Sequence, residues 1–132
     1  MLQNKINQLL QEILSLSSWE ERSEYFINLS KTIPEYPAEL KTTDRMVKGC
    51  QSSAWLDLYE ENGRIRISGT ANSVFVRGWI HLLILIYDRE TISEIHSDTS
   101  NFMGQIGFQE MVTVDRGTGL LSIFNRIKNF IG

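Results

Sequence analysis

Two alternating segments joined by Asn62-Gly63 constrain the fold of this 132-residue chain more than any other feature. Residues 53–59 alternate between two faces, with Ala54, Leu56 and Leu58 on one of them, and residues 64–68 alternate again after the turn. An Asn-Gly pair favours the positive-φ backbone of a two-residue hairpin turn. The sequence therefore predicts an antiparallel β-hairpin.

Helix signals lie before this hairpin. Apolar residues recur at three-and-four spacing from Leu2 to Leu14, which predicts an amphipathic helix. Ser18 followed by Glu21 has the form of a capping box, so a second helix should begin at Trp19. Pro34 should end it, because proline disfavours the helical state in the residue before it. Its predicted apolar stripe consists of Trp19, Phe26, Leu29 and Ile33.

Further helix signals follow the hairpin. Residues 74–87 are apolar almost all round, and their length favours a buried helix over a strand, with Asn72 or Ser73 as its cap. Thr91 and Glu94 form another possible capping box. The last helix should carry a stripe of Leu120, Ile123, Phe124, Ile127 and Ile131, with Arg116, Gly117 and Gly119 ahead of it.

This order of elements predicts an α+β fold, in which several helices pack on a small antiparallel sheet. The length and the lack of a linker-like stretch predict one domain over residues 1–132. A formal charge of -3, with no basic run, argues against binding to nucleic acid or to a membrane surface. Without a signal-like or membrane-spanning segment, we expect a cytoplasmic protein.

Cys50 is the one cysteine of the chain, so it forms no internal disulfide and no multi-cysteine metal site. It follows a glycine, just ahead of the first predicted strand, where a partner can reach a thiolate. Arg45 and Lys48 precede it, and nearby cations favour the nucleophilic thiolate. The competing interpretation is a free thiol that only fills space.

The string Lys48-Gly49-Cys50-Gln51-Ser52, followed by Trp55, resembles the active-site motif of the SufE/CsdE family of sulfur-acceptor proteins. Further landmarks agree in order and spacing. These are Asp44-Arg45, Val76-Arg77-Gly78 with the apolar run to Tyr87-Asp88, residues 101–108 and residues 116–128. The chain departs from the family pattern at Thr70-Ala71-Asn72, where relatives usually show acidic residues, and at His81, where they tend to carry a small one.

The resemblance implies that Cys50 accepts persulfide sulfur from a pyridoxal-phosphate-dependent cysteine desulfurase of the SufS or CsdA kind. The chain would stimulate that enzyme and pass the sulfur to an iron–sulfur scaffold, with no cofactor of its own and no independent catalysis. Gly49, Gln51, Ser52 and Arg116 are then the supporting residues of the site. The candidates for contact with the partner are Asp44, Arg45, Lys48 and Asn72.

Two other interpretations of Cys50 stay open on sequence alone. The first is a redox-sensing or interaction module, in which Cys50 is oxidised and transfers no sulfur. The second is a cysteine hydrolase with His81 or His96 as the base, although no signature links either histidine to the thiol. One cysteine and two dispersed histidines predict no metal site.

Overall fold

The computed structural model describes residues 2–47, 53–106 and 114–131, and only the backbone of residues 114–118. These residues contain six α-helices and a two-stranded antiparallel sheet, which confirms the predicted α+β class. With η denoting a 3-10 helix, the elements are α1 (Leu2–Leu14), α2 (Trp19–Lys31), η1 (Ala38–Leu40), η2 (Thr43–Arg45), β1 (Ala54–Glu61), β2 (Arg64–Ala71), α3 (Val74–Tyr87), α4 (Ile92–Ser97), α5 (Phe102–Gln105) and α7 (Val114–Lys128).

The predicted hairpin is confirmed. Strands β1 and β2 pair antiparallel in a register that sets Ala54 opposite Ala71 and Glu61 opposite Arg64. Asn62 and Gly63 have φ values of 55° and 77°, the left-handed pair that a two-residue turn requires. Leu56, Ile65 and Ile67 are buried, because their shared face of the hairpin packs against the helices.

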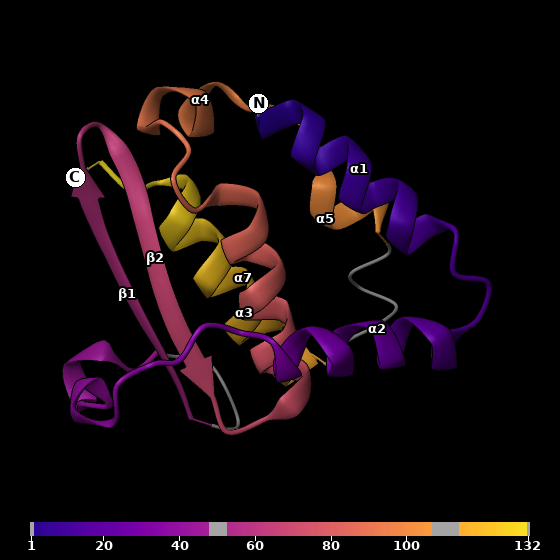
Figure 1. Cartoon of the computed structure of the whole chain (residues 1–132), viewed down its shortest axis with the longest axis horizontal. Helices are drawn as coiled ribbons and strands as arrows, with labels where there is room; N and C mark the ends of the chain where they lie inside the picture. Colours follow the sequence, from indigo (N-terminus) through magenta and orange to yellow (C-terminus); the bar gives the residue numbers. More distant parts are fainter. Residues whose placement is uncertain (1, 48–52, 107–113, 132) are drawn as a thin grey trace.

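Helix α3 forms the centre of the molecule. Ten of its fourteen residues are buried, as its nearly continuous apolar sequence predicts. The hairpin and α7 lie on one side of α3, whereas α1 and α2 lie on the other (Figure 1). This arrangement explains why α3 is apolar on most of its surface: other elements cover it from both sides.

Helices α2 and α3 cross closely at Gly78. A Cβ atom built there would overlap the carbonyl oxygen of Phe26, so a glycine is required at the crossing. One residue further on, Trp79 stacks on the Phe26 ring with centroids 4.7 Å apart. The close backbone approach and the aromatic stack together lock the two helices.

The predicted helix starts are confirmed by side-chain caps. The Ser18 hydroxyl accepts the Glu21 N–H at 3.1 Å, and the Thr91 hydroxyl accepts the Glu94 N–H at 3.1 Å. Of the two candidates for the cap of α3, the structure uses Ser73. Each hydroxyl satisfies an amide that has no partner within its helix.

Three details of the second and last predicted helices are wrong. Helix α2 ends at Lys31, ahead of Pro34, and Trp19 in its first turn is 49% exposed. Ile131 is 82% exposed, because it lies beyond the end of α7 and outside the stripe that packs on the core. Helical spacing identifies a stripe, but only neighbouring elements decide how much of it they cover.

Helix α7 also begins earlier than predicted. It starts at Val114, so Gly117 and Gly119 lie inside the helix and Arg116 lies in its first turn. Glycine within a helix costs only about 1 kcal/mol relative to alanine. Burial of Leu120, Ile123 and Ile127 against the core outweighs that cost.

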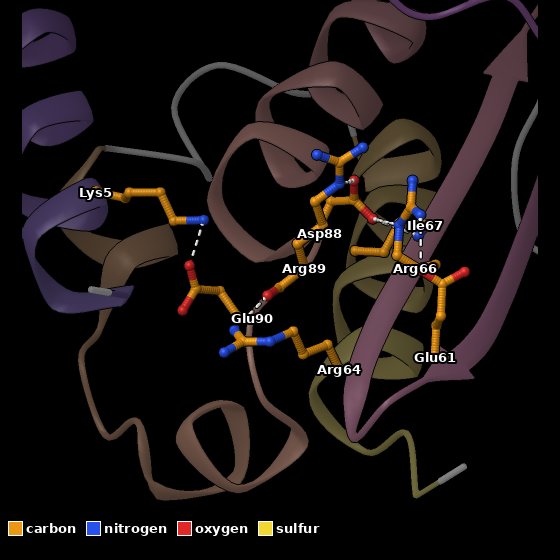
Figure 2. A network of polar contacts seen from close by, with 8 residues as sticks. All are labelled: Lys5, Glu61, Arg64, Arg66, Ile67, Asp88, Arg89 and Glu90. Atoms are coloured by element: carbon orange, nitrogen blue, oxygen red, sulfur yellow. Dashed lines mark hydrogen bonds and ion pairs between the residues drawn. The ribbon is translucent and has the colours of Figure 1, made fainter.

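A polar network holds the outer edge of β2 to the connection between α3 and α4 (Figure 2). The Arg89 N–H donates to the Ile65 carbonyl at 2.8 Å, and the Ile65 N–H donates to the Glu90 carbonyl at 3.0 Å. The Asp88 carboxylate accepts the Ile67 N–H at 2.8 Å and the Arg66 guanidinium at 3.2 Å. These residues cover β2 in place of a third strand.

Glu90 also connects this network to α1. Its carboxylate is 2% exposed and pairs with the Lys5 ammonium at 2.5 Å (Figure 2). The pair joins α1 to the segment that follows the C-terminal end of α3.

Among the described residues, no helix is both long and apolar enough to cross a bilayer.

Candidate functional site

The residues that flank the cysteine motif are held at the open end of the hairpin, away from its turn. The Val47 N–H donates to the Ala54 carbonyl at 2.8 Å, and Met46 bridges to Trp55. On the other side, the Asn72 N–H donates to the Ser53 carbonyl at 2.9 Å. Both flanks of the motif are therefore anchored on the sheet.

The central predicted site residues lie outside the described part of the chain. These residues are Lys48, Gly49, Cys50, Gln51 and Ser52. For Arg116 the structure places only the backbone, in the first turn of α7. The roles predicted for these six residues stay predictions.

The structure places the remaining partner-binding candidates on both flanks of that segment. Asp44 and Arg45 belong to η2, which precedes it. Asn72 follows β2, beside Ser53, and its side chain is exposed. Asp44 is exposed as well, so both side chains can contact a docked protein.

Arg45, in contrast, is already engaged. Its Nε donates to a carboxylate oxygen of Asp57 on β1 at 2.9 Å, and its second nitrogen donates to the Thr42 hydroxyl at 3.0 Å. The Tyr36 hydroxyl donates to the other Asp57 oxygen at 3.0 Å. Asp57 thus fixes both η2 and the segment before it, so Arg45 positions the approach to the cysteine motif.

Two titratable groups of this region are shifted by their surroundings. Burial, followed by the hydrogen bond to Asp57, raises the pKa of Tyr36 to about 12. The hydrogen bond from the Thr42 hydroxyl, 2.5 Å long, lowers the pKa of the exposed Asp44 carboxyl. Tyr36 therefore stays a donor and Asp44 stays charged at neutral pH.

Trp55 lies on the second rung of the sheet, opposite Thr70 and close to the motif. Its ring is 9% exposed, and the Lys41 ammonium lies 5.3 Å from the ring centroid. This cation–π contact ties the loop between η1 and η2 to the same end of β1. The indole Nε1 is buried and has no hydrogen-bond partner among the described residues.

A groove runs between η2, β1 and the end of α7, with a volume of about 540 Å³. Apolar side chains of Leu56, Leu58 and Phe130 line it together with polar ones. The polar residues are Asp44, Arg45, Asp57, Arg126 and Asn129. The groove therefore begins at the residues that lead into the cysteine motif and follows β1 away from it.

Sequence reasoning missed Tyr36 and Asp57 as positioning residues. The alternation of residues 53–59 predicts that Asp57 lies on the face away from Leu56 and Leu58. No local signal pairs Asp57 with Arg45 or Tyr36, which lie 12 and 21 residues away. The sequence feature that could have identified Asp57 is its position, as a carboxylate on the outer face of a strand next to the cysteine motif.

Both histidines bind backbone carbonyl groups. His81 is buried, as its apolar setting predicts, and its Nδ1 lies 2.7 Å from the Leu29 carbonyl, so it donates there. The His96 Nε2 likewise donates to the Phe130 carbonyl at 2.7 Å. Each histidine thus joins two segments of the fold, and this geometry lends no support to a hydrolase base.

The described residues contain no group of three or more His, Cys, Asp and Glu side chains that could hold a metal ion. The described polar groups near the motif include the Asp44 and Asp57 carboxylates, the Arg45 guanidinium group and backbone amides. These groups can bind a protein surface and hold the motif in place.

Comparison with known proteins points to one family. Residues 7–131 match the family model of SufE, the Fe-S metabolism associated domain. An uncharacterized SufE-like protein of Rhizobium meliloti (strain 1021) is 31% identical over 129 residues, with 94% of this chain and 92% of the relative covered. The cysteine desulfuration protein SufE of Wigglesworthia glossinidia brevipalpis is 29% identical over 126 residues, covering 94% and 87%.

The fold agrees with a solved structure. The solution structure of a hypothetical protein from Thermus thermophilus superposes with a TM-score of 0.76 at 22% identity, covering 94% of this chain and 90% of that one. That similarity supports the fold. The match of the family model over nearly the whole chain, with the relative at 31% identity, shows that this protein belongs to the SufE family and has a role in Fe-S metabolism.

Proposed function

We propose that this chain accepts sulfur on Cys50 from a pyridoxal-phosphate-dependent cysteine desulfurase and passes it to an iron–sulfur scaffold. The observation that carries the proposal is the Gly49-Cys50 motif of a SufE-family chain, bounded on both sides by residues bonded to the end of the hairpin. The cofactor belongs to the desulfurase, and the acceptor step needs none of its own.

The transfer is a thiol–persulfide exchange. The Cys50 thiolate attacks the terminal sulfur of the donor cysteine persulfide and forms a new S–S bond. The S–S bond of the donor breaks, and the donor cysteine leaves as a thiolate. A persulfide is created on Cys50 as one is consumed on the donor, so no external oxidant or reductant is needed.

The residues described around the motif support this step by positioning. Exchange requires the attacking sulfur to reach the donor sulfur directly. Hydrogen bonds from Val47 and Asn72 fix the two flanks, and Arg45 fixes η2 through Asp57. Removal of sulfur from the donor cysteine then raises the turnover of the desulfurase.

Intact-mass spectrometry tests the proposal directly. Incubation of the chain with a cysteine desulfurase and free cysteine should add the mass of one sulfur atom, which a thiol reductant removes. The matched Cys50→Ser chain should gain no mass and should not raise the rate of cysteine consumption.

Consumption of cysteine by the desulfurase with no mass added to the wild-type chain would contradict the proposal. The same chain treated with peroxide alone distinguishes the redox-sensing alternative. A redox module forms a defined oxidised state at Cys50 but accepts no sulfur.

A further inference from the structure

The two edges of the sheet differ in how they are covered. Backbone groups of Arg89 and Glu90 bond Ile65. The Asp88 carboxylate accepts the Ile67 N–H (Figure 2). The outer edge of β2 is therefore already occupied at Ile65 and Ile67.

Within the part of the chain that the structure describes, the outer edge of β1 is covered only at its beginning. The Val47 N–H meets the Ala54 carbonyl there, and Met46 bridges to Trp55. Leu58 pairs with Ile67 and Glu60 with Ile65 across the hairpin. Because Ile65 and Ile67 direct their amides outward, these are the rungs without hydrogen bonds between β1 and β2.

Leu58 and Glu60 consequently direct their N–H and C=O groups away from β2. No backbone or side-chain group among the described residues bonds these four groups. An exposed edge of this kind is a template on which another extended segment can pair. The 540 Å³ groove lies beside it, with Leu58 on the strand side and Phe130 on the helix side.

We propose that this free edge of β1 receives an extended segment of the desulfurase that delivers sulfur to Cys50. The inference rests on the proposed function and adds a second contact to it. Leu58 is four residues from Ala54, where the motif is anchored, and this corresponds to about 13 Å along a strand. A protein interface of standard size is roughly 30 Å across. A desulfurase that docks at the motif therefore extends over the edge.

The charges on β1 argue against a second copy of this chain as the occupant. An antiparallel β1–β1 pair has to avoid the covered beginning of the strand, which leaves registers centred on Tyr59 or Glu60. The register centred on Tyr59 sets Asp57 opposite Glu61 of the second copy. The register centred on Glu60 sets the two Glu60 side chains opposite each other. Like charges directly opposite each other destabilise a strand pair.

The charges on and beside β1 also predict which side chains the docking segment of the desulfurase carries. The residue opposite Glu60 is basic, since Glu60 is exposed and takes part in none of the ion pairs formed by the described residues. The residue opposite Leu58 is apolar, because a cation there would meet Arg126 in the groove whereas an apolar side chain can contact Phe130. The docking segment thus carries an apolar and a basic side chain two residues apart, with its backbone bonded to β1.

Glu60→Pro tests whether the outer edge of β1 pairs with a segment of the desulfurase. Glu60→Pro removes one outward N–H and obstructs an incoming strand, but it breaks no bond to β2. Glu60→Ala removes the charge and keeps the N–H, so it is the matched control. We measure the concentration of each chain that half-saturates sulfur loading by the desulfurase. Glu60→Pro should raise it by about tenfold and Glu60→Ala by clearly less.

If Glu60→Pro and wild type half-saturate sulfur loading at the same concentration, the docking of the desulfurase on this edge is wrong. The proposed function would remain intact. Absence of sulfur loading in the wild type would instead contradict the proposed function. Hydrogen exchange provides a measurement that needs no variant at residue 60. In the complex of the desulfurase with the Cys50→Ser chain, the Leu58 and Glu60 amides should be protected, and unchanged exchange at both would also overturn the inference.

Discussion

Asp57 is the residue on which the approach to the cysteine motif depends. One of its oxygens accepts from Arg45 and the other from Tyr36, so both sides of the carboxylate are in use. In Asp57→Asn, an NH₂ group replaces one of these acceptors and faces a donor. We expect a loss of about 1 kcal/mol in the free energy of unfolding, measured by urea denaturation.

A double-mutant cycle identifies the source of that loss. Asp57→Asn and Arg45→Met, measured singly and together, should show a coupling of at least about 0.5 kcal/mol, because the residues share one network. Additive losses would mean that the two side chains do not interact in solution. The sequence could place Asp57 on the outer face of a strand, but its partners come from tertiary structure and carry no local signal.

At the scale of elements, the crossing of α2 and α3 depends on the absence of a side chain at Gly78. Gly78→Ala puts a methyl group against the backbone of Phe26, which cannot rotate away. We expect a loss of about 3 kcal/mol, the upper end of the usual cost of overpacking. Gly63→Ala is the control. Its Cβ would meet nothing within 4 Å, so only the positive φ costs energy, about 1 kcal/mol.

Thermal or urea unfolding of the two variants gives the comparison, and a smaller loss of stability for Gly78→Ala than for Gly63→Ala would exclude the close crossing.

The elements themselves were largely predictable, because turns and caps are local. Asn62-Gly63, Ser18 and Thr91 act within a few residues of their own position. The early start of α7 was not predictable, since its glycines are tolerated only because later residues of the helix are buried.

At the scale of the whole molecule, a partly buried ion pair joins the end of α7 to Asp98, the residue that follows α4. The Lys128 ammonium donates to the Asp98 carboxylate at 3.0 Å and to the carbonyl groups of Ile95 and Asp98 at 3.1 Å. Burial alone would raise the pKa of Asp98, but hydrogen bonds from Ser100 and Lys128 outweigh it and lower the pKa below its ordinary value.

A carboxyl whose pKa is lower in the folded state stabilises the fold above its ordinary pKa, near 4, and this contribution disappears as the pH falls through the lowered value. Asp98→Asn should therefore be less stable than wild type at pH 7, and the difference should shrink in acid. Melting temperatures from about pH 7 to pH 3 provide the measurement. A difference that stays constant with pH would show that Asp98 does not titrate with folding.

The partner of Asp98 can be tested at neutral pH. Lys128→Met leaves a buried carboxylate without its cation and should cost about 3 kcal/mol. Lys128→Arg keeps the charge and is the matched control, with a smaller loss expected. The sequence identified Lys128 only as a cation suited to the end of a helix, because its partner Asp98, just after α4, lies 30 residues away.

The pairing of Lys5 with Glu90 has a consequence for the order in which the chain folds during synthesis. The two residues are separated by 85 positions, so α1 leaves the ribosome long before its partner does. One oxygen of Glu90 has no hydrogen-bond partner among the described residues, and Lys5 supplies the counter-charge of the other. Until α1 docks, burial of this carboxylate is unfavourable, and the α3–α4 connection has to stay hydrated. Helix α1 can therefore form its contact with Glu90 only after the α3–α4 connection has been made.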